Sequence, residues 1–255
     1  MNPTDRRVEI VNIIRQFTRI TVEELAEILH LSRETIRRDL TELAHHGKVS
    51  KFHGGASLPL TTDEGTFRNR MSENVSAKVL ISEEAVKLIM PGETLFIDTG
   101  STTLYFAERL TNVPGLTVVT NSAEIARTMS LAKSQSKTFL LGGEFNGDNR
   151  QTIGSITISQ IQSFRAHHAI LTIGALDART GIMDFCINEA QVAQAMIKQA
   201  ESVTILADHS KLGRIASFEV CSLKKITNLI CNESPSGSIK TALLEAGVNI
   251  ITIGT

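Results

Sequence analysis

The sequence predicts an α/β protein in two parts, a small helical N-terminal domain and a larger domain built on a parallel β-sheet. Apolar residues recur at helical spacing through residues 5–46. Beyond residue 76, short apolar segments alternate with amphipathic ones, which is the pattern of parallel strands covered by helices on both faces. A chain of 255 residues is long enough for two such domains.

The N-terminal part is expected to contain three helices followed by a small β-hairpin. The first two helices each place apolar residues at i, i+3, i+4 and i+7, namely Ile10, Ile13, Ile14 and Phe17 in one and Val22, Leu25, Ala26 and Leu29 in the other. Thr21 and Glu24 have the spacing of a capping box, and Ser32 is a suitable N-cap for the third helix. A Gly-Gly pair at 54–55 then allows a tight turn. The order of elements over residues 1–57 is that of a helix-turn-helix with a β-wing.

The third helix carries the residues that point to a function. Ile36 and Leu40 define its core face, and three arginines lie outside that face: Arg33, Arg37 and Arg38. Guanidinium groups near the start of a helix can enter the major groove of double-stranded DNA and bind guanine or phosphate. Basic side chains of the wing would then contact the DNA backbone or the minor groove: Lys48, Lys51 and His53. Two alternatives stay open, a solvated face on which Glu34 and Asp39 pair with arginines, and a module that binds another protein.

Residues 58–75 begin with a segment that contains Pro, Thr and Gly and has no apolar period, and they are expected to link this head to a domain spanning 76–255. Seven apolar segments of that domain are expected to be strands: 94–98, 116–120, 137–141, 169–174, 202–208, 226–231 and 248–253. Helical patterns lie between several of them: 83–90, 102–110, 188–200 and 237–247.

The first of these strands leads through a loop of small polar residues into a helix. The loop consists of Asp98, Thr99, Gly100, Ser101, Thr102 and Thr103. Its backbone N–H groups would point outward at the helix N-terminus beside side-chain hydroxyls, which makes a site for an anion such as phosphate. The alternative is an ordinary turn in which Ser and Thr only cap the helix. The loop is neither a P-loop nor a dinucleotide-binding fingerprint.

Further polar residues are expected at the same edge of the sheet, because the carboxyl ends of parallel strands meet there. They are Asn121, Gly143, Asp177, Glu189, Asp208 and Lys211. Carboxylates, an amide and a lysine around a phosphate site suit a small phosphorylated sugar or polyol. A local role remains open for each residue alone; for example, Asp208 and Lys211 could form a loop ion pair worth about 0–1 kcal/mol.

Composition argues against several other classes of protein. No apolar run approaches the roughly 20 residues of a membrane span, and the N-terminus has no apolar signal segment. Cysteines are three in number and lie in or beside apolar stretches, so we expect reduced thiols in a cytoplasmic protein. No Cys/His set has zinc spacing, no motif indicates a covalent nucleophile, and no cofactor is expected. Because the net charge is -1, DNA binding would depend on a local patch.

The segment from Val22 to Ala56 closely resembles the winged helix-turn-helix of DeoR-family bacterial transcriptional regulators, above all in the pattern S-x-x-T-I-R-R-D-L from Ser32 to Leu40. The resemblance extends over nearly the whole chain. It implies a sequence-specific DNA-binding protein, usually a repressor of a sugar-catabolic operon that acts as a dimer or larger homo-oligomer. Carried onto this sequence, it assigns operator contacts to Arg37 and Arg38, with neighbouring roles for Ser32, Arg33 and Thr35.

The larger domain of that family resembles ribose-5-phosphate isomerase, a Rossmann-type α/β fold. The match includes the phosphate loop at 98–103 and the stretches 174–177, 187–190 and 207–214. The resemblance implies that a glycerol or sugar phosphate is sensed as an effector. A sugar-phosphate isomerase with an accessory helical domain is the alternative. We expect a regulator and not an enzyme, since isomerase activity does not explain an N-terminal helical domain with exposed arginines.

Overall fold

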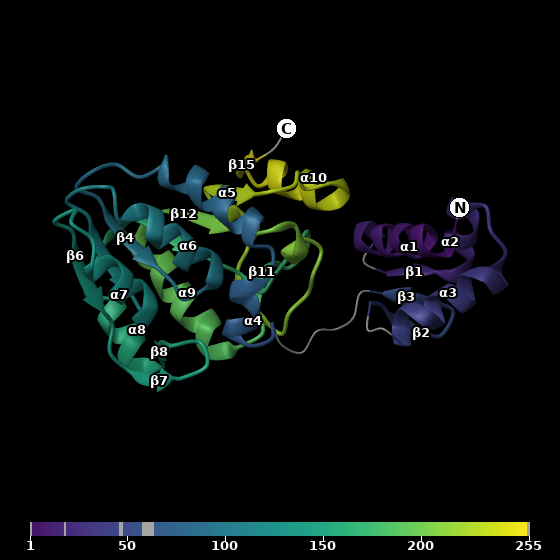
Figure 1. Cartoon of the computed structure of the whole chain (residues 1–255), viewed down its shortest axis with the longest axis horizontal. Helices are drawn as coiled ribbons and strands as arrows, with labels where there is room; N and C mark the ends of the chain where they lie inside the picture. The colour runs from purple at the N-terminus through teal and green to yellow at the C-terminus, as the bar shows by residue number, and fades with distance from the viewer. Residues whose placement is uncertain (1, 18, 46–47, 58–63, 254–255) are drawn as a thin grey trace. The chain divides into compact units, whose positions relative to one another are not determined.

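The computed structural model describes residues 2–17, 19–45, 48–57 and 64–253. The chain divides into two compact units, residues 1–61 and 62–255, and each unit has hydrophobic clusters of its own. Figure 1 shows both units and labels many of their helices and strands. This agrees with the two-part organisation that the hydrophobic patterns indicate.

The smaller unit is a winged helix-turn-helix. Three helices alternate with three short strands in the order α1 (Pro3–Phe17), β1 (Arg19–Thr21), α2 (Val22–Leu29), α3 (Arg33–His45), β2 (Ser50–Phe52) and β3 (Gly55–Ser57). The strands form one antiparallel sheet in the order β1-β3-β2. The three predicted helices and the wing are thus confirmed, and β1 is an additional strand that closes the wing sheet against the helices.

Local signals fix the helix boundaries of this unit. The capping box at the start of α2 is present, because Thr21 Oγ1 accepts a hydrogen bond from the Glu24 backbone N–H and Glu24 accepts one from that of Thr21. Ser32 Oγ caps α3 by accepting the Thr35 N–H at 3.1 Å. Apolar residues from all three helices form one core, including Ile14, Leu25, Ile36 and Leu40. Phe17 is an exception: helical spacing placed it with the core, yet at the end of α1 it is 56% exposed.

The turn of the wing needs both of its glycines. Gly54 has a φ of +87°, a conformation that L side chains rarely adopt. A Cβ at Gly55 would lie 2.3 Å from the carbonyl oxygen of Ile20 and 2.5 Å from the Phe52 ring. Close packing of the wing against β1 therefore requires glycine at position 55.

The larger unit contains a seven-stranded parallel sheet in the order β15-β14-β12-β9-β4-β5-β6. Its strands are β4 (Thr94–Ile97), β5 (Thr117–Thr120), β6 (Lys137–Leu140), β9 (Ala166–Leu171), β12 (Ala200–Leu206), β14 (Asn228–Cys231) and β15 (Asn249–Thr252). Each of the seven predicted apolar segments forms one of these strands, so the sheet is the part of the fold that the sequence predicts best.

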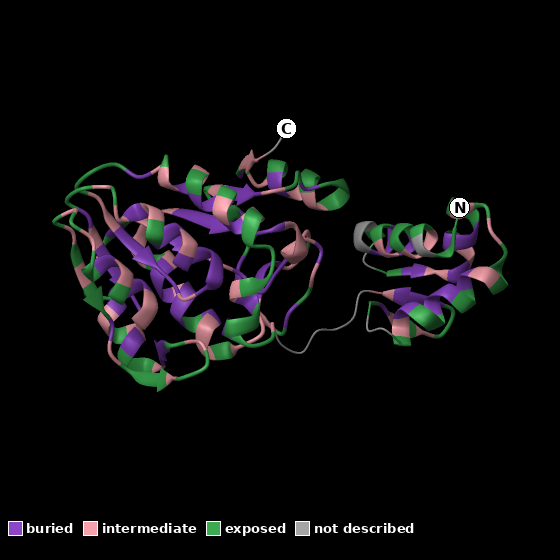
Figure 2. Ribbon diagram, in the orientation of Figure 1, coloured by how far each residue is buried: buried purple, intermediate pink, exposed green. Residues whose placement is uncertain are grey.

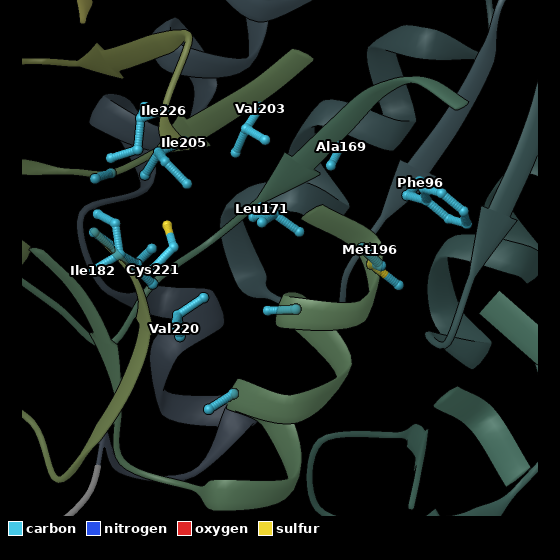
Figure 3. Close-up of a cluster of buried hydrophobic side chains, with 14 of the residues drawn as sticks. Phe96, Ala169, Leu171, Ile182, Met196, Val203, Ile205, Val220, Cys221 and Ile226 are labelled. Carbon is cyan, nitrogen blue, oxygen red and sulfur yellow. The ribbon is translucent and has the colours of Figure 1, made fainter. Parts of the chain in front are cut away.

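Helices cover both faces of this sheet. One face packs against α5 (Val75–Val86), α6 (Ser101–Leu110) and α7 (Ala123–Ser130), and the other against α8 (Ser155–Ile161), α9 (Ile187–Gln199) and α10 (Gly237–Glu245). Alternate residues of one strand serve the two faces: Leu95 and Ile97 join the first cluster, and Phe96 joins the second. Figure 3 shows Phe96 with Leu171, Ile205 and other members of the second cluster. Figure 2 shows the buried strands between exposed outer helix faces.

Three features of the larger unit differ from the sequence prediction. The helix expected at 83–90 begins earlier, and α5 ends at Val86. Short antiparallel strands were not anticipated: β7 (Glu144–Asn146) pairs with β8 (Gln151–Ile153), and β10 (Ala175–Asp177), β11 (Gly181–Asp184) and β13 (Phe218–Cys221) form a small sheet. Two 3₁₀ turns, η1 (His209–Lys211) and η2 (Leu223–Lys225), were also missed. Elements of three or four residues are too short to show a hydrophobic period.

The second half of the expected linker is structured. Residues 58–63 lie outside the described part of the chain. From Glu64 onward the chain belongs to the larger unit, where α4 (Phe67–Ser72) buries Phe67 in the cluster beneath α5 and α6. This segment is structured because the side chains of Phe67 and Arg70 are both buried in the larger unit.

The described helices include none that is long and apolar enough to cross a membrane. All three cysteines are free, and Cys221 and Cys231 are buried. Burial raises the pKa of the Cys221 thiol to about 12 and that of Cys231 to about 11. These two thiols are protonated at neutral pH and pack as core residues.

Candidate functional sites

The outer surface of α3 presents a group of charged and polar side chains. Ser32, Arg33, Arg37 and Arg38 are exposed, and Thr35 is half-buried. Arg33 lies 3.6 Å from Glu23 of α2, at an exposed position where such a pair is worth little. The guanidinium groups of Arg37 and Arg38 make no ion pair with any described residue. They are therefore available to an external anion.

A buried carboxylate fixes α3 against α1. Asp39 is 2% exposed and accepts hydrogen bonds from Arg6 Nε at 2.5 Å and from Arg7 Nε at 3.1 Å. Burial alone would raise the pKa of Asp39, but the hydrogen bonds from Arg6 and Arg7 outweigh it and lower this pKa. Asp39 thus pairs with arginines of α1, so Arg37 and Arg38 keep their free guanidinium groups.

One side-chain hydrogen bond joins the wing to α3, and a cation–π contact joins the wing to β1. Lys51 Nζ donates a 2.9 Å hydrogen bond to Thr41 Oγ1, and the Arg19 guanidinium lies 3.9 Å from the centre of the Phe52 ring. Lys48 and His53 are exposed. The hydrogen bond to Thr41 places the ammonium group of Lys51 beside the polar face of α3.

In the larger unit, a pocket opens at the carboxyl ends of four neighbouring strands, β12, β9, β4 and β5. Residues that directly follow these strands line it, together with side chains from the β7–β8 hairpin, β11, α4 and α9. The polar lining residues are Glu64, Arg70, Asp98, Thr99, Gly100, Ser101, Thr102, Asn121, Gln151, Thr172, Asp184, Glu189, Asp208 and Lys211. The parallel topology therefore brings distant parts of the sequence to one place.

Several hydrogen-bonding groups in this pocket lack a partner. The N-terminus of α6 has no side-chain cap, and the first N–H groups of a helix have no acceptor within the helix. Thr99 Oγ1 and Asn121 Oδ1 are buried and have no hydrogen-bond partner among the described residues. A Cβ at Gly100 would lie 2.1 Å from Thr172 Oγ1, so glycine permits the close approach of the loop to β9. Buried polar groups are rarely left unpaired, so these groups indicate a place for a polar ligand.

Carboxyl groups also line the pocket, and three of them have raised pKa values. Burial raises the pKa of Asp98 well above its ordinary value, against two hydrogen bonds from the Thr172 N–H. Burial and then the charge of Glu189 raise the pKa of Asp184 to about 7. Burial also raises the pKa of Glu189, although Gln151 and Asn149 donate to it at 2.6 Å. Such groups can exchange hydrogen bonds with the hydroxyls of a ligand.

Two cations of the pocket pair with a further carboxylate, that of Glu64. Lys211 Nζ lies 2.5 Å from Glu64 Oε1, and Arg70 pairs with the other oxygen of Glu64. Arg70 also donates to Asn149 at 2.8 Å, which links it to Glu189. The local pair considered from the sequence, Asp208 with Lys211, does not occur among the described contacts. The Asp208 carboxylate instead accepts hydrogen bonds from Asn74 and from its own turn.

Comparison with known proteins decides the family. A model of the DeoR C-terminal sensor domain matches residues 73–233, and a model of the DeoR-like helix-turn-helix domain matches residues 6–62. The chain belongs to the DeoR family. It is a DNA-binding transcriptional regulator and not an enzyme, which decides against the isomerase alternative.

Relatives of this DeoR-family regulator match along almost its full length. The glycerol-3-phosphate regulon repressor of Escherichia coli is 31% identical over 98% of this chain and 99% of its own. The glycerol-3-phosphate regulon repressor of Haemophilus influenzae is 32% identical over 94% and 93%. The repressor GlcR of Bacillus subtilis is 31% identical over 98% and 96%. Among solved structures, ribose 5-phosphate isomerase A of Methanocaldococcus jannaschii covers 55% of each chain at 18% identity and a TM-score of 0.41.

Of the residues expected to bind an effector of this DeoR-family chain, nine line the pocket and three do not: Thr103, Gly143 and Asp177. The Thr103 hydroxyl donates to the carbonyl oxygens of Asp98 and Gly100, so it stabilises the loop. Asp177 Oδ1 accepts three hydrogen bonds from Arg179 and Thr180 in the β10–β11 turn. A Cβ at Gly143 would lie 2.2 Å from Thr157 Oγ1. Their described contacts are structural.

Five polar lining residues of the DeoR-family pocket were not anticipated: Glu64, Arg70, Gln151, Thr172 and Asp184. Thr172 could have been found from the sequence: the predicted strand at 169–174 ends at Leu171 in the structure, and Thr172 is the residue that follows it. The other four lie in the expected linker or in short antiparallel strands. Nothing in their local sequence pattern signals that they face the pocket.

Proposed function

We propose that this chain is a repressor whose larger unit senses a small phosphorylated sugar or polyol and whose winged helix reads paired operator half-sites as a homo-oligomer in the cytoplasm. Arg37 and Arg38 would contact bases or phosphates in the major groove, with Ser32, Arg33 and Thr35 beside them. Lys48, Lys51 and His53 would contact the flanking backbone. The unpaired guanidinium groups on an otherwise braced α3 support this assignment.

One observation carries the proposal for the effector. Unpartnered donors and acceptors at the N-terminus of α6, at Thr99 and at Asn121 share a pocket with Lys211 and Arg70. A phosphate group would accept from the N–H groups and hydroxyls, and a cation would balance its charge. Asp98 and Asp184, carboxyl groups of the same pocket with raised pKa values, would exchange hydrogen bonds with the hydroxyl groups of a sugar or polyol.

Glycerol 3-phosphate is the first effector to test, because two relatives are named as repressors of a glycerol-3-phosphate regulon. Fluorescence anisotropy would follow binding to DNA from upstream of the protein's own gene and its neighbours, at fixed salt. Glycerol 3-phosphate or another sugar phosphate is expected to change the operator affinity by at least tenfold, and glycerol alone is not. A response to glycerol alone, or to no phosphorylated compound, would contradict the proposal.

A pair of matched variants tests the site itself. Thr99→Val removes an unpartnered buried hydroxyl inside the pocket, and Thr138→Val removes an unpartnered buried hydroxyl of β6 outside it. We expect Thr99→Val to weaken binding of the phosphorylated effector about tenfold, and Thr138→Val to leave it unchanged, by calorimetry. Equal effects of the two variants would place the phosphate elsewhere.

A further inference from the structure

The pocket already holds an anion that belongs to the chain. Glu64 reaches it from the segment that precedes α4, and its carboxylate contacts both Lys211, at 2.5 Å, and Arg70. All three side chains are largely removed from water: Glu64 is 13%, Arg70 11% and Lys211 17% exposed. Each oxygen of the Glu64 carboxylate therefore pairs with its own cation.

No other described carboxylate pairs with these two cations. Asp208 is held by Asn74 and by its own turn, and Glu189 by Asn149 and Gln151. Arg70 Nε, of the same guanidinium group, is buried and has no partner in the part of the chain that the structure describes. The guanidinium and the ammonium together offer more donors than Glu64 uses, as a subsite for a larger anion would.

The position of Glu64 in the chain gives this contact a consequence. It is seven residues after Ser57, the last residue of the winged-helix sheet, and three residues before Phe67, which is buried in the larger unit. Glu64 is thus the first described residue of the larger unit after the DNA-binding unit. A change in its position acts on the covalent connection between them.

Resting on the proposed function, we propose that Arg70 and Lys211 form the subsite for the anionic group of the effector and that Glu64 occupies this subsite in the unliganded protein. Binding of the effector displaces Glu64 and thereby changes the affinity for the operator. The effector and the carboxylate compete for the same two cations. If displacement of Glu64 is what changes operator affinity, a substitution that releases Glu64 from the two cations should change operator affinity in the same direction as the effector does.

The test compares Glu64→Gln with a matched control, Glu124→Gln. Glu124 also pairs with two cations, Arg127 and Arg150, is 20% exposed, and does not line the pocket. Gln keeps the size of the side chain but removes the charge that competes. We expect Glu64→Gln to bind glycerol 3-phosphate and inorganic phosphate at least fivefold more tightly than wild type by calorimetry. Without effector, its operator affinity should match that of wild type saturated with effector.

A thermal-shift measurement with inorganic phosphate covers the case in which Glu64→Gln folds less stably, because two unpaired buried cations are destabilising. Phosphate should then raise the melting temperature of Glu64→Gln more than that of wild type or Glu124→Gln. Equal or weaker phosphate binding by Glu64→Gln, together with a normal operator response, would overturn this proposal and leave the proposed function standing. If no phosphorylated ligand affects even the wild type, the proposed function fails and this proposal fails with it.

Discussion

The chain presents cations in two contrasting ways. On α3, Arg37 and Arg38 are exposed and form no ion pair with described residues, while the helix beneath them is fixed by Asp39 and its partners in α1. In the pocket of the larger unit, Arg70 and Lys211 are enclosed and already paired with Glu64. Exposed cations on a rigid support suit a large polyanion that approaches from solvent. Enclosed, paired cations suit a small anion that must enter and replace an existing partner.

The largest difference should appear in the response to salt. Operator binding through exposed cations releases counterions from DNA, so raising salt from 50 to 200 mM should weaken it by about 10³-fold if six phosphates are contacted. Effector binding in the pocket exchanges one carboxylate for another anion and should change only a few-fold. Anisotropy and calorimetry over one salt series would check both. A similar salt dependence of the affinities for operator and effector would contradict the distinction between exposed and enclosed cations.

Loss of the exposed arginines should be nearly as severe. Replacing both Arg37 and Arg38 by Ala should weaken specific operator binding by about 10²-fold or more, since each base or phosphate contact is worth about 1–3 kcal/mol. Binding of glycerol 3-phosphate should not change. Arg127→Ala, which removes an exposed arginine of α7, is the control. An unchanged operator affinity in the double variant would favour the protein-interaction alternative for the winged helix.

The enclosed carboxyl groups should make stability depend on pH. The pKa of Asp184 is raised to about 7 in the folded protein, so the folded state binds more protons than the unfolded state between about pH 4 and 7. The stability that this group contributes is therefore present below pH 4 and is lost as pH rises to 7. Asp184→Asn should be more stable than wild type by about 1–3 kcal/mol at pH 8 and nearly equal at pH 4. Chemical denaturation at the two pH values would check this, and an equal difference at both would contradict the assignment.

The smallest effect concerns the support of the exposed surface. Thr41→Val removes the hydrogen bond that aligns Lys51 with α3 but leaves every arginine in place. Operator affinity should fall only about two- to fivefold, because an exposed hydrogen bond contributes about 0.5–1.5 kcal/mol. Thr111→Val, which removes an exposed hydroxyl at the end of α6, serves as the control in the anisotropy assay. A loss as large as that of the double arginine variant would mean that Thr41 contacts DNA itself.

Much of the fold was predictable because it depends on local patterns. The capping box of Thr21 and Glu24, the cap at Ser32 and the seven apolar strands all follow from residues close in sequence. The exposed surface of α3 was predictable for the same reason: helical phase alone places Arg37 and Arg38 away from Ile36 and Leu40.

The pocket was predictable only in part. Residues that directly follow parallel strands, such as Asn121 and Asp208, were found because all parallel strands end at one edge of the sheet. Asp177 was included by the same reasoning, yet it is the last residue of the further short strand β10, and its carboxylate accepts hydrogen bonds within the β10–β11 turn. Asp184, at the end of β11, lines the pocket, whereas Asp177 does not.

By itself, the sequence determined the two units, the order of their main elements and the surface of the winged helix, since these follow from short-range periodicity and capping. Only the tertiary structure decided that Glu64 and Arg70, from an apparent linker, join Lys211 from a loop about 140 residues later. Such a contact depends on the order of strands in the sheet and on where a short helix such as α4 finds a buried position. Neither property can be predicted from the residues next to Glu64, because both arise from the packing of segments that are far apart in the chain.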